Sequence, residues 1–244
     1  MTKNNHFNQL DRLLRQQASD SAGLNEAAVF RYAEMLAQVE GSLVVVSDLV
    51  KGTSRIFSGV FARRLGIDGY SSENSIWEKE ILKLMSETEQ EIKVIAELRF
   101  FHYLRRLPKH RKSEYFLMSK LRFNESVEVL HRMYYVYDEK LESVRCAICI
   151  YGPLTVDFPG QSYAVNTATG IKEELTTAAN EAVISKRERQ ILQLISSGMK
   201  SIEIAEALSI SKNTVSRHRQ EILAKMQVKN SVEACRLAKS MGLI

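Results

Sequence analysis

The sequence has few of the residues that build cross-linked proteins and lacks the long apolar runs of membrane-spanning ones. Its 244 residues include three cysteines, three prolines and one tryptophan. An odd and low number of cysteines argues against a disulfide framework and favours a reducing compartment. The polar start has no apolar signal core, and no apolar run approaches the roughly 20 residues of a membrane-spanning helix. We therefore expect a cytoplasmic protein with no membrane contact.

Motifs that carry catalysis are also missing. The chain has no Gly-rich phosphate loop, no Gly-x-Ser-x-Gly turn and no cluster of histidines and carboxylates. Cys146 and Cys149 have the spacing of a metal-ligand pair, but in a predicted strand residues i and i+3 point to opposite faces. We interpret them as core residues and expect no catalytic residue, no metal and no cofactor. An enzyme-like N-terminal domain is a remote alternative.

The bulk composition is that of an ordinary globular protein, but the charge is unevenly distributed. Hydrophobic residues make up 45% and charged residues 26%, and the net charge is +5. From residue 184 onward there are 11 basic and 5 acidic residues (11 − 5 = +6), whereas the rest has 23 basic and 24 acidic residues (−1). Phosphate backbones attract such a local excess. The pattern predicts a polyanionic partner for the C-terminal quarter.

The N-terminal part alternates helical and strand patterns. Predicted helices cover residues 25–40, 60–65 and 76–107, the last stopped by Pro108. Predicted strands cover 42–48, 53–58, 115–123, 127–137 and 144–151. We expect a loop over 158–170 and a short helix or linker over 171–182.

From residue 184 the pattern is purely helical. Ser185 and Glu188 have the spacing of a capping box, in which each side chain bonds to the backbone N–H of the other. The first helix is expected to end near Gly198. A second helix over 201–208 and a third over 212–226 follow closely. Two short helices joined this tightly are typical of a helix-turn-helix.

The third helix has two faces, and Ser211 is placed to cap its start. Val215, Ile222 and Met226 share one stripe and are expected to pack inward. A polar stripe lies on another face, from which side chains can reach base edges in the major groove. Its members are Asn213, Ser216, Arg217 and Gln220. Three flanking residues are expected to contact phosphates: Lys212, Thr214 and Arg219.

Several motifs in this region agree in register with a known family. They are Ser185 to Arg189, Gly198, Glu203 to Ala205, Leu208 to Ser211, Thr214-Val215 with His218, Lys225 and Val228. In these residues the chain resembles the LuxR-type (GerE-like) DNA-binding domain. The resemblance implies an all-α four-helix domain whose last helix, around 231–240, makes dimer contacts. We add Lys200 and Lys225 to the expected DNA-binding residues and assign dimerisation to Val232, Cys235, Arg236 and Lys239.

The sequence departs from this family pattern at four positions. Two positions that often carry Lys, one that is often basic and one that often carries Arg hold other residues. The residues in their place are Ser216, Gln220, Ile202 and Ser231. We expect Arg217 and Arg219 to supply charge instead, and the target sequence to differ from those of well-known members.

The order of elements in residues 25–157 resembles a PAS-like sensor fold, with a helix, a hairpin, further helices and three antiparallel strands. The residues that carry this resemblance are Leu43 to Asp48, Ile56 to Ser58, Phe61 and Leu65-Gly66. The expected fold class is α+β. The expected parts are a polar segment (1–24), the PAS-like domain (25–157), a loop and linker helix (158–181) and the helix-turn-helix domain (182–244). Ligand-binding residues are unknown.

We therefore expect a bacterial-type, dimeric, sequence-specific transcription regulator that binds double-stranded DNA. Its N-terminal domain is expected to sense a small-molecule ligand or a partner, and RNA polymerase is a further candidate partner. An N-terminal domain that only dimerises is an alternative. A sigma-factor-like protein is a remote one, because the preceding chain contains strands. The patterns of a phosphoreceiver domain and of an autoinducer-binding pocket are missing.

Overall fold

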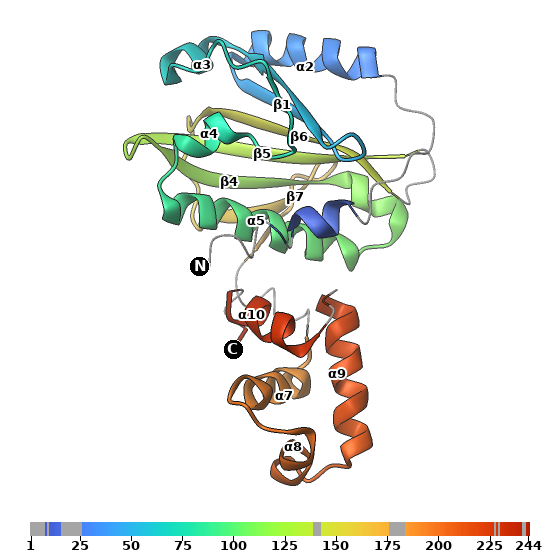
Figure 1. Cartoon of the computed structure of the whole chain (residues 1–244). Helices are drawn as coiled ribbons and strands as arrows, with labels where there is room; N and C mark the ends of the chain where they lie inside the picture. The colour runs from blue at the N-terminus through green and yellow to red at the C-terminus, as the bar shows by residue number, and fades with distance from the viewer. Residues whose placement is uncertain are drawn as a thin grey trace. The chain divides into compact units, whose positions relative to one another are not determined.

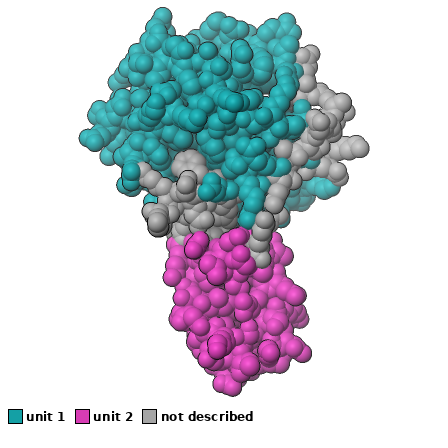
Figure 2. Space-filling view, in the orientation of Figure 1, with its two compact units in different colours: residues 1–174 teal, residues 175–244 magenta. Residues whose placement is uncertain are grey.

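The computed structural model describes residues 8, 10–15, 26–138, 143–175, 184–226, 228, 230–240 and 243–244. The chain divides into two compact units, residues 1–174 and 175–244 (Figure 2). Each unit has its own set of buried apolar side chains. Among the helices in the described ranges, none combines the length and the apolar character needed to cross a membrane.

One antiparallel sheet of eight strands forms the centre of the N-terminal unit (Figure 1). The strand order is β3-β2-β1-β6-β5-β4-β7-β8. The strands are β1 (Leu43–Asp48), β2 (Thr53–Ser58), β3 (Ser72–Glu73), β4 (Tyr115–Phe123), β5 (Val127–Tyr137), β6 (Val144–Pro153), β7 (Ser162–Asn166) and β8 (Lys172–Glu174). The helices are α2 (Glu26–Glu40), α3 (Val60–Leu65), α4 (Lys79–Lys83), α5 (Glu87–Arg105) and the 3₁₀ helix η1 (Lys109–Glu114).

Helices cover both faces of this sheet, so its central strands are buried on both sides. Val44 and Ile150 pack with Ala33 and Ala37 of α2 on one face. Helix α5 lies against the other face (Figure 1). Double burial explains why β1 has a continuous apolar run in place of an alternating pattern.

The long helix predicted over residues 76–107 is wrong, because the structure contains two helices there. Helix α4 ends at Lys83 and α5 starts at Glu87. Ser86 is the N-cap of α5, and its side chain accepts a hydrogen bond from the backbone N–H of Glu89 at 3.2 Å. In a continuous helix the Glu89 N–H would donate to a backbone carbonyl. Here the Ser86 side chain accepts from it, so a new helix starts. The Ser-x-x-Glu spacing of residues 86–89 is the local signal for this break.

Strands β7 and β8 correct the expectations for residues 158–182. Strand β7 lies in the predicted loop and pairs antiparallel with β4, and β8 pairs with β7. Residues 172–174 are therefore extended and not helical. The pairing occupies the backbone groups of β4 that would otherwise form a bare sheet edge. The rest of the expected linker helix, residues 176–182, lies outside the described residues.

The C-terminal unit is helical throughout its described elements. They are α7 (Lys186–Ser196), α8 (Ser201–Ala207), α9 (Lys212–Met226) and α10 (Ser231–Ser240). Its buried core includes Ile191, Leu192, Ile204, Val215, Ile222, Met226 and Ala238. The α+β fold class, with an all-α C-terminal unit of four helices, is confirmed.

Candidate nucleic-acid interface

The start of α7 is fixed by a reciprocal capping box. The Ser185 Oγ accepts a hydrogen bond from the Glu188 N–H at 3.2 Å, and the Glu188 Oε2 accepts one from the Ser185 N–H at 2.6 Å. Lys225 of α9 donates to both Glu188 oxygens, at 2.7 and 2.8 Å. Burial alone would raise the pKa of Glu188, but the hydrogen bonds from Lys225 and Ser185 outweigh burial and lower it. This carboxylate therefore ties the first helix of the unit to the third.

A tight turn joins α8 to α9. Ser209 has a positive φ of 52°, and the Ile210 N–H donates to the Ala205 carbonyl at 2.9 Å. Ser211 then caps α9, because its Oγ accepts from the Thr214 N–H at 3.0 Å. Val215 lies one turn into α9 and is fully buried. The local geometry is that of a helix-turn-helix, with α9 as its second helix.

The polar stripe predicted on α9 is exposed in the structure. All four members are exposed: Asn213, Ser216, Arg217 and Gln220. The Arg217 side chain is 69% exposed and lies 3.5 Å from Glu221 on the same helix. Val215, Ile222 and Met226 are buried on the other side of α9, as their spacing predicts. The polar stripe thus presents neutral hydrogen-bonding groups and one guanidinium to solvent.

The flanking basic residues fall into two groups. Lys200 and Lys212 are exposed near the starts of α8 and α9. Arg219 is half-buried and donates to the Ser201 Oγ at 2.8 Å and to the Ser231 Oγ at 3.0 Å. Arg219, like Lys225, is thus already engaged inside the unit. The Thr214 hydroxyl likewise lies 2.9 Å from the Ser211 Oγ.

The four residues expected to make dimer contacts do not all lie on the surface of α10. Val232, Arg236 and Lys239 are exposed, and Val232 is 61% exposed. Cys235 is buried, and its thiol donates to the Leu192 carbonyl of α7 at 3.7 Å. Only the three exposed residues are available to a second molecule, so we withdraw Cys235 from the proposed dimer surface.

Sequence reasoning missed the contacts that hold the helices of this unit together. Arg187 donates to the Leu208 carbonyl at the end of α8, at 2.8 Å. Glu188 was identified only as a capping residue, whereas it also binds Lys225. These partners lie 21 and 37 residues apart, beyond the reach of helical spacing rules. The only signal in the sequence is that Arg187 and Glu188 belong to the family motif.

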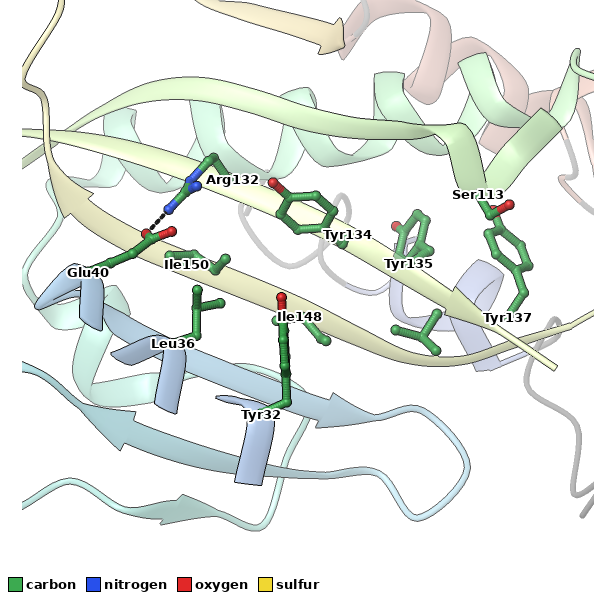
Figure 3. Close-up of a pocket in the computed structure, with 11 residues that line it drawn as sticks. Tyr32, Leu36, Glu40, Ser113, Arg132, Tyr134, Tyr135, Tyr137, Ile148 and Ile150 are labelled. Carbon is green, nitrogen blue, oxygen red and sulfur yellow. Dashed lines mark hydrogen bonds and ion pairs between the residues drawn. The ribbon is translucent and has the colours of Figure 1, made fainter. Parts of the chain in front are cut away.

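The N-terminal unit has an open groove of about 500 Å³ between α2 and the sheet (Figure 3). Tyr32 and Leu36 of α2 face Ile148 and Ile150 of β6 across it (Figure 3). An ion pair between Glu40 and Arg132 lies at one end. Tyr134 and Tyr137 add aromatic surface along β5. Apolar walls with a few polar groups are typical of a surface that binds a small molecule or another chain.

The opposite face of the sheet buries a cluster of ionisable side chains. Lys93 of α5 is 1% exposed, with its Nζ 2.6 Å from the Glu97 Oε1 and 3.7 Å from the Glu78 Oε2. Burial opposes the charge of Lys93, but the two carboxylates outweigh burial and hold its pKa above the usual value. Burial, together with the nearby Lys93, lowers the pKa of His131 and keeps its ring neutral.

Comparison with known proteins places the C-terminal unit in a family. The family described as bacterial regulatory proteins, luxR family, matches residues 182–238. The transcriptional regulatory protein DesR of Bacillus subtilis is 37% identical over 75 residues, which cover 31% of this chain and 37% of DesR. The quorum-sensing regulator RhlR of Pseudomonas aeruginosa is 42% identical over 66 residues, 27% of each chain. This chain thus spans about a third of the length of the curated relatives it matches.

Most of the chain can also be aligned with a solved structure. The crystal structure of a phage VqmA–DPO complex aligns with 89% of each chain at 14% identity and a TM-score of 0.33. The match to the luxR family instead rests on the motifs of residues 182–238, which the structure arranges as a capped α7, a tight α8–α9 turn and an exposed α9 stripe. The C-terminal unit of this chain therefore carries a helix-turn-helix domain of the luxR family of bacterial regulatory proteins.

Proposed function

We propose that this protein is a dimeric, sequence-specific DNA-binding transcription regulator. The observation that carries the proposal is the exposed polar stripe of α9, in a unit whose sequence matches the luxR family. Asn213, Ser216, Arg217 and Gln220 would read base edges, while Lys200 and Lys212 would contact phosphates. A dimer would bind half-sites about one helical turn apart. A non-enzymatic role, action in the cytoplasm and contact with RNA polymerase belong to the same proposal.

Fluorescence anisotropy with selected DNA fragments tests the DNA-binding part. For the full chain, the logarithm of the affinity is expected to fall linearly with the logarithm of the salt concentration. Lys212→Ala should weaken binding to all sequences and lower the salt slope by about one. Arg122→Ala is the matched control, because it removes the same charge from an exposed position on β4. Affinity that does not respond to salt, or equal losses in both variants, would contradict the proposal.

The N-terminal unit is proposed to sense a ligand or a partner. The groove between α2 and the sheet supports this role, because its volume of about 500 Å³ suits a small molecule. Native mass spectrometry of the purified full chain, with a thermal-shift screen of small metabolites, is the direct measurement. We expect a bound mass or a reproducible shift of the melting temperature. Ile150→Trp should remove this signal by filling the groove. Ile148→Ala, which enlarges the groove without filling it, serves as the second variant.

A purely dimerising N-terminal unit is the second candidate, and one observation favours it. Tyr32, Met35 and Val39 form an exposed apolar stripe on α2, with exposures of 57%, 57% and 80%. Such a stripe is typical of a surface that another chain covers. Val39→Glu should then lower the dimer fraction in analytical ultracentrifugation, and no metabolite should shift the melting temperature.

A further inference from the structure

The buried cluster behind the sheet brings together three potential metal ligands from three elements. Glu97 lies on α5, His131 on β5 and Cys149 on β6. One ligand atom from each lies within 4.8 Å of the other two. All three side chains are buried, at 4%, 0% and 5% exposure. Met133 pairs with Cys149 in the sheet register, so His131 and Cys149 are diagonal neighbours on one face.

The contacts of the His131 imidazole are typical of a metal-bound histidine. Its Nδ1 lies 3.1 Å from the Ser119 Oγ, and its ring stacks on Tyr151 with centroids 4.8 Å apart. Within the described part of the chain, its Nε2 has no hydrogen-bond partner and lies 3.9 Å from the Glu97 Oε1. A metal-bound histidine typically bonds a second group through its other nitrogen, which fixes the ring. The unpartnered Nε2 is therefore aimed at a position that a ligand would fill.

The acceptors of the cluster outnumber its cations. Two buried carboxyl groups, those of Glu78 and Glu97, share one ammonium, that of Lys93. Burial raises the pKa of Glu97, because the low dielectric disfavours its charged form. The Glu78 Oε2 makes no hydrogen bond with any described residue. A buried carboxyl oxygen without a partner is costly, and a bound cation would remove this cost.

We propose that Glu97, His131 and Cys149 bind a divalent transition-metal ion of the Zn²⁺ type. A carboxylate oxygen, an imidazole nitrogen and a thiolate sulfur are donors that Zn²⁺ accepts together. On binding, the Cys149 S–H bond breaks, its proton leaves to solvent and the thiolate donates its electron pair to the metal. Because one proton leaves as the ion binds, binding adds one positive charge to the cluster (+2 − 1 = +1). Three protein ligands leave one tetrahedral position open.

Metal binding at this place would connect α5 to the sheet. The Lys93 ammonium now occupies the nearest cation position, 2.6 Å from the Glu97 Oε1. A metal on Glu97 displaces it toward Glu78, which stands before α4. Occupancy would thereby be coupled to the packing of α4 and α5 on the sheet. The proposed site lies within the N-terminal unit alone. A negative test of metal binding would therefore leave the DNA-binding proposal unchanged, and a negative test of DNA binding would leave the metal site unchanged.

Cobalt substitution in the full chain tests the proposal, because a thiolate bound to Co²⁺ gives a charge-transfer band in the near ultraviolet. Titration with Co²⁺ alone is expected to produce this band at one ion per chain. Cys149→Ser should abolish the band and weaken binding by about tenfold or more. Cys146→Ser is the matched control, because Cys146 is buried on the same strand but faces α2. It should keep the band and change the affinity by less than about twofold.

A second measurement covers the case in which Cys149→Ser fails to fold. His131→Gln removes a ligand and keeps the thiol, so it should shift the band and weaken Co²⁺ binding by about tenfold. The melting temperature of the unaltered chain should rise with Zn²⁺ and that of His131→Gln should not. The described side chains hold a second group of potential ligands, Glu188, His218 and Glu221, which lacks a thiol and gives no such band. No band in the unaltered chain, or a band that persists in Cys149→Ser, would overturn the proposal.

Discussion

The candidate sites of the two units place their ionisable side chains in opposite ways. The C-terminal unit keeps Arg217 and Lys212 on the surface, where solvent screens their charges. The N-terminal unit buries Lys93, Glu97 and His131 behind its sheet. An exposed charge contributes little to folding but is available to a partner, whereas a buried one is strongly coupled to the stability of its fold. The same substitution should therefore act on stability in one unit and on binding in the other.

The largest effect is expected at Lys93. Lys93→Met leaves the Glu78 and Glu97 carboxylates buried without their ammonium, which should destabilise the N-terminal unit by about 3–5 kcal/mol. Urea unfolding followed by the fluorescence of Trp77 measures this loss, because the one tryptophan of the chain lies in this unit.

The control for Lys93 is an exposed ion pair with a similar distance between nitrogen and oxygen. Lys83 lies 2.7 Å from Glu80, but its side chain is 70% exposed. Lys83→Met should cost less than about 1 kcal/mol, because exposed pairs contribute little. Adding Glu78→Gln and Glu97→Gln to Lys93→Met should recover much of the loss, since no charge is then left buried. Equal losses for Lys83→Met and Lys93→Met would show that burial does not distinguish the two pairs.

The next effect is expected at Glu188, which is the one buried carboxylate among the described residues of the C-terminal unit. Glu188→Gln should destabilise this unit by about 1.5–3 kcal/mol, nearer the lower value because Lys225 is half-exposed. The pKa of Glu188 is lowered in the folded unit. Its contribution is therefore present above the unfolded pKa of about 4.3 and lost as the pH falls through the folded pKa.

Far-ultraviolet circular dichroism follows the unfolding of both units in urea, whereas Trp77 fluorescence follows the N-terminal unit alone. The transition seen only by circular dichroism should therefore be that of the C-terminal unit. The unaltered chain and Glu188→Gln should differ at neutral pH and converge in acid. A constant difference across pH 7 to 3 would mean that the carboxylate charge contributes nothing.

The sequence predicted one of two similar helix-capping contacts and missed the contacts made across elements. The capping box of Ser185 and Glu188 spans three residues and was predicted correctly. The same spacing at Ser86 and Glu89 was overlooked, because the apolar pattern around it continues on both sides. Lys93 and Glu97 are spaced like any exposed i, i+4 pair. Only the strands that cover them, with His131 and Cys149, make them a buried cluster.

A smaller effect is expected at Arg219, where the structure and the sequence prediction assign different partners. Arg219→Ala removes hydrogen bonds to Ser201 and Ser231 and should cost about 1–2 kcal/mol of stability in the C-terminal unit. A double-mutant cycle with Ser231→Ala should show coupling, because each variant breaks the same contact. If the salt slope of DNA binding instead falls by about one with no loss of stability, Arg219 contacts a phosphate.

The smallest effect on folding is expected at Arg217, which should have the clearest effect on sequence choice. Arg217→Ala should change the stability of the C-terminal unit by no more than about 0.5 kcal/mol, because the side chain is 69% exposed. Arg217→Lys keeps the charge but not the planar fork that binds guanine at two atoms. Anisotropy on the selected site and on single-base variants should therefore give an unchanged salt slope for Arg217→Lys and a loss of about 1–3 kcal/mol of discrimination at one base pair. If Arg217→Lys discriminates between base pairs as well as the unaltered chain does, Arg217 contacts a phosphate. The base contacts would then be made by Asn213, Ser216 and Gln220.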